Sequence, residues 1–145
     1  MYSGLLHAHS GLRWLVLIFL IVAIANAFSK KKSGVWTPKD RKLSAMAMGM
    51  VHLQFVIGLV LYFISPKVSF TKGFMQNDVL RFYAVEHISM MIVAIALISI
   101  GHSKAKKAAI DSKKFGAIAT FYLIGLIIML ASIPWPFRNL GGAWF

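Results

Sequence analysis

Glu86 and His87 are neighbours inside the apolar run 80–100, and their side chains can do chemistry that the rest of the run cannot. A carboxylate can pair with a cation, and an imidazole can move a proton or bind a metal. About 20 apolar helical residues cross a hydrocarbon layer roughly 30 Å thick, so this run is long enough to do so. A charge at the centre of that layer costs at least ~2.5 kcal/mol. We therefore expect both side chains to face neighbouring helices.

Four further polar residues lie in or beside apolar runs. Arg13 and Glu86 are the only opposite charges that we expect to be buried within such runs, and pairing them costs less than burying either one alone. The sequence thus predicts a buried Arg13–Glu86 ion pair that fixes helix register, or alternatively a polar ligand facing one of the two. An intramembrane histidine needs a hydrogen-bond partner or a metal, which makes His52 and His87 candidate metal ligands. His7 and His9 form a weaker metal-binding pattern.

Composition restricts the class of protein. The 145 residues fit a single domain, and with 59% hydrophobic and 14% charged residues they predict an integral membrane protein. The net charge of +12 comes from positive residues concentrated in two short loops, which indicates membrane orientation rather than nucleic-acid binding. The chain has no cysteine, so disulfides and thiolate-bound metals are excluded.

The hydrophobic pattern predicts an all-α, four-helix transmembrane domain over residues 1–145, with spans at about 5–28, 43–64, 80–101 and 115–133. Lysines follow the first run instead of preceding it, so we expect a retained span and not a cleaved signal peptide. Thr37 and Pro38 have the pattern of an N-cap and a first-turn proline, so we expect the second helix to start near Pro38. Asn77 can cap the third helix.

Loop charges predict the orientation of the helices. Six basic residues lie in loop 29–42 and five in loop 103–114, which places both termini on the outer side of an antiparallel bundle. Helical rise then puts Arg13, Glu86 and His87 at similar depths in the outer half. His52 lies near mid-bilayer, about two turns from His87, and His7 is separated from His87 by a similar amount, so depth alone selects no pair of axial ligands.

A cysteine-free helical bundle suits haem b, because imidazoles from two helices can hold the iron while the macrocycle fills the space between them. The segments HAHSGLRW, RFYAVEH and IPWPFRNLG resemble small bacterial four-helix membrane proteins labelled cytochrome b-like, over the whole chain. The resemblance implies haem b and electron transfer. It implies these ligand candidates: His7 or His9, His52 and His87. It also implies that three basic residues suit the haem propionates: Arg13, Arg81 and Arg138.

Three functions are therefore considered. The first is haem b-mediated electron transfer near the outer face of the bacterial inner membrane. The second is a non-catalytic accessory subunit of a larger respiratory or transport complex, with partner subunits docked on its apolar faces. The third is a bundle that binds quinone or lipid without haem, through Arg13, Trp14 and Glu86. The sequence contains no catalytic triad, phosphate-binding loop or zinc-spaced cluster.

Overall fold

The computed structural model describes all 145 residues and contains helices but no strands. The prediction of an all-helical protein with four long apolar helices is confirmed, and all four are long and apolar enough to cross a membrane. The elements are α1 (Tyr2–Lys30), α2 (Pro38–Ile64), η1 (Phe74–Gln76), α3 (Asp78–Arg81), η2 (Phe82–Glu86), α4 (His87–Lys107), α5 (Asp111–Ser132) and η3 (Pro136–Arg138). Elements α3, η2 and α4 follow one another without a break and form the third long helix.

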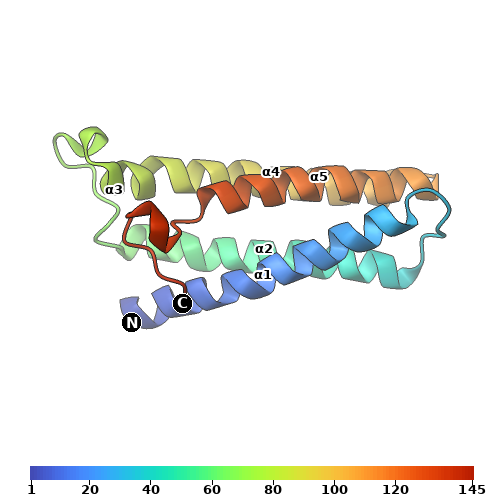
Figure 1. Ribbon diagram of the computed structural model, residues 1–145, viewed down its shortest axis with the longest axis horizontal. Helices are drawn as coiled ribbons and strands as arrows, with labels where there is room; N and C mark the ends of the chain where they lie inside the picture. Colours follow the sequence, from blue (N-terminus) through green and yellow to red (C-terminus); the bar gives the residue numbers. More distant parts are fainter.

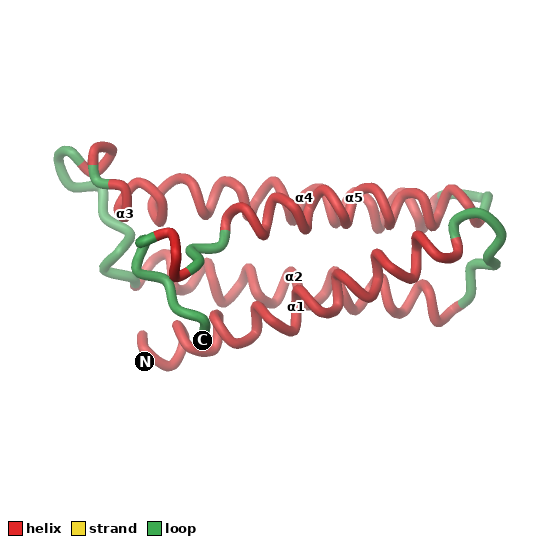
Figure 2. The backbone as a smooth tube through the Cα atoms, viewed as in Figure 1, coloured by secondary structure: helices red, strands yellow, loops and turns green.

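Both chain termini lie at one end of the elongated molecule (Figure 1). We call this end the terminal end. The connections 31–37 and 108–110 lie at the opposite end, which we call the lysine-rich end (Figure 2). The segment after α5 turns back and runs along the outside of the terminal end toward α1 (Figure 1). This return brings the last residues of the chain beside the first helix.

A capping network fixes the start of α2 at the lysine-rich end. Thr37 caps the helix, Pro38 occupies its first turn, and the Asp40 side chain accepts a hydrogen bond from the Thr37 amide at 2.9 Å, as in a capping box. The same carboxylate accepts from Asn26 at 2.8 Å and from Lys30 at 2.7 Å, both on α1. Asp40 is 3% exposed. The network therefore joins α1 to α2 through one buried, fully hydrogen-bonded acid.

Close helix packing forms the core along α1, α4 and α5. A Cβ at Gly125 would lie 2.7 Å from Cγ1 of Ile98, so glycine lets α4 and α5 approach each other. Tyr122 is fully buried in this core, and its hydroxyl donates to the Ser44 carbonyl on α2 at 2.7 Å. Many aliphatic side chains on the outer helix faces are exposed, such as Leu53 and Ile92, which is the arrangement that lipid contact requires.

A π-helical turn interrupts the third long helix immediately before His87. The His87 amide donates to the Phe82 carbonyl, five residues earlier, instead of the residue four positions back. The extra residue leaves a carbonyl without its usual partner, and the Tyr62 hydroxyl of α2 donates to the carbonyl of Ala84 at 2.8 Å. The turn changes which residues of this helix face its neighbours, and such turns are frequent at functional sites.

Candidate functional site

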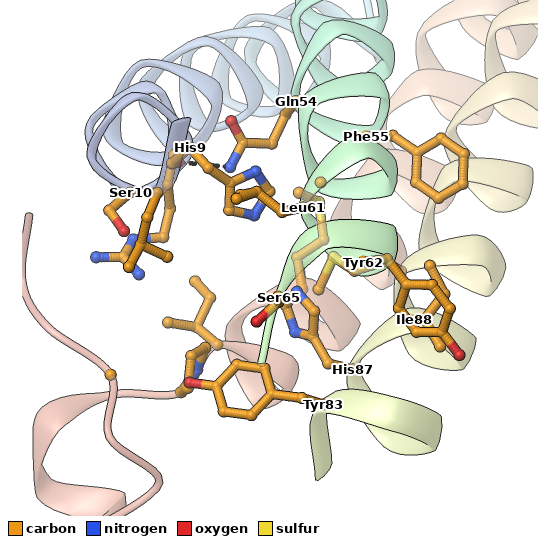
Figure 3. Close-up of a pocket in the computed structure, with 18 of the residues that line it drawn as sticks. His9, Ser10, Gln54, Phe55, Leu61, Tyr62, Ser65, Tyr83, His87 and Ile88 are labelled. Carbon is orange, nitrogen blue, oxygen red and sulfur yellow. Dashed lines mark hydrogen bonds between the residues drawn. The ribbon is translucent and has the colours of Figure 1, made fainter. Parts of the chain in front are cut away.

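A cavity of about 200 Å³ lies at the terminal end, between α1, α2 and the η2–α4 segment (Figure 3). One water molecule needs only ~10–15 Å³ of such space, so the cavity is large enough for a ligand. Aliphatic residues such as Val51 and Met91 line it together with a smaller polar set. The polar side chains are those of Tyr2, His7, His9, Ser10, Arg13, Gln54, Tyr62, Ser65, Lys67, Tyr83 and His87.

His9 extends from α1 toward α2, where Gly58 makes room for its ring. A Cβ at Gly58 would lie 2.8 Å from the His9 Cε1 atom, closer than side-chain carbons pack. Gln54, one turn earlier on α2, donates from Nε2 to the His9 carbonyl at 2.8 Å. The His9 Nδ1 atom is buried and has no hydrogen-bond partner. The α2 surface therefore holds this imidazole in the cavity wall and leaves one ring nitrogen free.

His87 is oriented by the C-terminal end of α5. Its Nδ1 atom lies 2.7 Å from the Ser132 carbonyl oxygen, which can only accept, so Nδ1 carries the proton. That carbonyl is free because Ser132 is the last residue of α5, and the last four carbonyls of a helix have no intrahelical partner. Nε2 of His87 is then the unprotonated nitrogen and makes no hydrogen bond within the protein. Metal-ligating histidines are typically held in this way.

Buried polar atoms without a hydrogen-bond partner are concentrated in residues that line the cavity. Four buried side-chain atoms in the molecule lack a hydrogen-bond partner, and three of them belong to residues that line this cavity. These three are Nδ1 of His9, Nε of Arg13 and Oε1 of Gln54. Each unsatisfied buried group costs about 1–3 kcal/mol. Such unsatisfied groups are uncommon in proteins and call for an explanation, and here they are concentrated in the residues around one cavity.

The C-terminal segment closes the outer side of the cavity. Arg13 donates from Nη2 to the carbonyls of Ala143 at 3.0 Å and Trp144 at 2.7 Å, and the indole of Trp14 donates to Trp144 at 2.9 Å. Lys67 donates to the Gly141 carbonyl at 2.6 Å. Three donors from the helices and their connection thus hold the segment through its backbone. All of these acceptors are neutral, so both cations at the cavity rim keep an uncompensated charge.

The predicted Arg13–Glu86 ion pair is wrong. Arg13 binds backbone carbonyls of the C-terminal segment, while Glu86 accepts from Nε of Arg81 at 2.7 Å. The π-helical turn is the physical reason, because its i to i+5 spacing places Arg81 and Glu86 on the same side of one helix. The proposed Arg13, Trp14 and Glu86 head-group site loses its acid for the same reason.

His52 does not join His87 at the cavity, so these two candidate metal ligands do not share one site. His52 is on the exposed face of α2 and does not line the cavity. Its Nδ1 lies 2.8 Å from the Met48 carbonyl, and its Nε2 lies 3.2 Å from the Ser99 hydroxyl on α4. Both ring nitrogens are therefore already used. Instead, His87 on the third long helix lines the terminal-end cavity together with His9.

The three arginines that the resemblance links to haem propionates differ in where they lie. Arg13 lines the cavity, but Arg81 and Arg138 do not. Arg81 binds Asp78 and Glu86 at the surface. Arg138 donates to the Ala131 carbonyl at 2.9 Å and so caps the end of α5. Arg81 and Arg138 thus have protein partners outside this cavity, and their role with haem propionates stays a prediction.

Sequence reasoning did not identify Gly58, Gln54 or Tyr83 as site residues. Gln54 carried a usable signal, since an amide inside an apolar span needs a polar partner. His7 lines the cavity as expected, although its side chain is exposed. Of the two histidines on α1, His9 is thus the one whose ring α2 holds in the cavity wall.

No protein-family model, curated protein or solved structure matches this chain.

Proposed function

We propose that this protein is a small membrane cytochrome b-like protein that holds haem b in the terminal-end cavity and transfers electrons there. In this proposal the four helices form an antiparallel bundle in a bacterial inner membrane, with both termini on the outer side. The concentration of basic residues in loops 29–42 and 103–114 supports that orientation. Electron exchange then takes place near the outer face.

The observation that carries the proposal is the state of the two cavity imidazoles. His87 has its Nδ1 proton bonded to a carbonyl and its Nε2 lone pair free, which prepares it to ligate iron. His9 comes from a different helix and has a buried ring nitrogen with no partner. Both histidines line one cavity, and two imidazoles from facing helices are a usual way for a helical bundle to hold haem.

The chemistry of the rest of the cavity lining also supports the proposal. Its wall is mainly apolar around the histidines, with aliphatic and methionine side chains such as Val51, Met91 and Met129, which suits a flat macrocycle. Arg13 and Lys67 lie at the outer rim and donate only to neutral carbonyls, so they can bind carboxylates. Haem b, when bound, supplies reversible one-electron chemistry, and the chain's own residues position it and exclude water.

The test is the visible spectrum of the purified protein from haem-replete cells. We expect a Soret band in the wild type and its loss in His87→Ala and in His9→Ala. His52→Ala is the matched control, because His52 is also an intrahelical histidine but lies outside the cavity. It should keep the band. A featureless wild-type spectrum overturns the proposal, as does equal loss in all three variants.

A quinone is a second candidate ligand. The unsatisfied Arg13 Nε and His9 Nδ1 atoms can donate to the carbonyl oxygens of a quinone ring, and the apolar wall can take its tail. Mass spectrometry of lipids that co-purify with the protein distinguishes this case. Quinone present at one per chain, without haem, favours it.

A further inference from the structure

A second site lies at the lysine-rich end, far from the cavity described above. An open groove runs between the end of α4 and the start of α5, and Lys104, Lys107 and Lys113 line it. Its floor includes the small residue Gly116. Lys31, from the connection after α1, also reaches this floor, because a Cβ at Gly116 would lie 3.4 Å from its Cε atom. Lysines from three segments of the chain thus converge on one groove.

The positive charge of the groove is not neutralised by the protein. The lysine-rich end has two carboxylates, and both are already in ion pairs. Asp40 pairs with Lys30 at 2.7 Å, and Asp111 pairs with Lys114 at 3.4 Å. The four groove lysines form no ion pair. Like charges held close together repel one another, so an anion that enters the groove is favoured.

The helix faces beyond the groove are apolar. On α4, the face that carries Lys104 continues one turn away with Ile100, which is 44% exposed. On α5, the face that carries Lys113 continues through Thr120 to Ile124, which is 43% exposed. Both faces change from lysine to exposed aliphatic side chains in the same direction. A molecule with an anionic head and apolar chains matches this pattern, whereas a free phosphate ion matches only half of it.

We propose that this groove binds an anionic phospholipid, with the phosphate among the four lysines and the acyl chains along α4 and α5. Basic pockets between membrane helices recognise anionic head groups in this way. The Thr120 hydroxyl is exposed in the groove and can donate to a phosphate or glycerol oxygen. The proposal does not depend on haem binding at the terminal end.

Native mass spectrometry of the detergent-purified protein tests it, with phosphatidylglycerol and phosphatidylcholine of identical acyl chains in competition. We expect phosphatidylglycerol to be retained preferentially. The groove variant combines K31Q, K104Q, K107Q and K113Q. The control variant removes the same charge from the same end by combining K32Q, K39Q, K42Q and K106Q. The groove variant should bind phosphatidylglycerol at least ~10-fold more weakly, and the control should stay within about twofold of wild type.

A variant that keeps every charge separates the groove from general surface potential. Thr120→Trp fills the groove and leaves all four lysines in place, so it should also weaken phosphatidylglycerol binding by at least ~10-fold. Equal losses in the groove and control variants, or no effect of Thr120→Trp, would show diffuse attraction and overturn the proposal. Displacement of the lipid by millimolar inorganic phosphate overturns it too, since that identifies a site for a soluble anion.

Discussion

The lysine-rich end and the terminal end of the molecule differ in how they bury polar groups. At the lysine-rich end, both oxygens of the buried Asp40 carboxylate are hydrogen-bonded, Oδ1 to Asn26 and Lys30, and Oδ2 to Thr37. Of the four unsatisfied buried side-chain atoms, only Nδ1 of His102 lies near this end. The arrangement around Asp40 is what a purely structural network requires.

At the terminal end, by contrast, three buried atoms of residues that line one cavity have no partner. The helix is also irregular there, because the π-helical turn lies directly before His87. Unsatisfied polar atoms and irregular helical turns both cost stability, and proteins concentrate them at functional sites. The comparison teaches that Asp40 and its partners hold the fold together, while the terminal end combines the features on which the proposed ligand site rests.

The largest expected effect is at the structural end. Asp40→Ala removes the acceptor of four hydrogen bonds and leaves buried donors unpaired, which should lower the free energy of unfolding by about 3 kcal/mol. Unfolding in detergent, followed by circular dichroism, measures it. Asp78→Ala is the control, because its ion pair with Arg81 is exposed and should contribute no more than about 1 kcal/mol. If both variants lowered the free energy of unfolding equally, the buried Asp40 network would not be the structural element assigned here.

At the terminal end, Arg13→Gln should cost less. It removes the two charged hydrogen bonds that hold the C-terminal segment, for a loss of about 1–2 kcal/mol in the free energy of unfolding. The freed segment should also become more sensitive to limited proteolysis. Arg41→Gln is an exposed control with no partner and should stay within about 0.5 kcal/mol of wild type. Unchanged cleavage of the segment in Arg13→Gln contradicts the assigned contact.

Gly58→Ala tests whether the position of His9 matters for the ligand. The new methyl group would lie 2.8 Å from the imidazole and must displace it, so we expect haem to bind about tenfold more weakly, equivalent to ~1.4 kcal/mol. Gly49→Ala on the same helix is a matched control, because no atom lies within 4 Å of the added group. It should keep wild-type affinity. Equal affinity of the two variants would separate His9 from the site.

The smallest expected effect on stability is that of Gln54→Leu. The change removes one hydrogen bond to the His9 carbonyl and also one unsatisfied buried oxygen. These contributions oppose each other, so the ligand-free protein should change by less than about 1 kcal/mol. Haem affinity should fall severalfold if the amide serves the ligand. A loss of more than about 2 kcal/mol without ligand would make Gln54 a structural residue.

Local signals in the sequence were sufficient for the helices and their starts. Thr37, Pro38 and Asp40 form the capping box that their spacing predicts, and the Asn77 side chain accepts from the Leu80 amide at 3.0 Å. Capping depends on residues within one turn of each other, so a single sequence contains the necessary information. Four long apolar runs became four long helices for the same reason.

The site needed information that is not local. Depth along regular helices placed Arg13 near Glu86, but a π-helical turn and the return of the C-terminal segment gave both side chains other partners. Depth also could not show which face of α2 carries His52. His9 and His87 were each candidates, yet their pairing depends on Gly58 and on the free Ser132 carbonyl, which are distant in sequence.

The most direct measurement is a titration of the haem-free protein with haem, followed by absorbance. We predict saturation at one haem per chain for the wild type and for His52→Ala, and no saturable binding for His87→Ala or His9→Ala. Saturable binding that survives both cavity substitutions, or a wild type that never saturates, would contradict the assignment of the terminal end as a haem site.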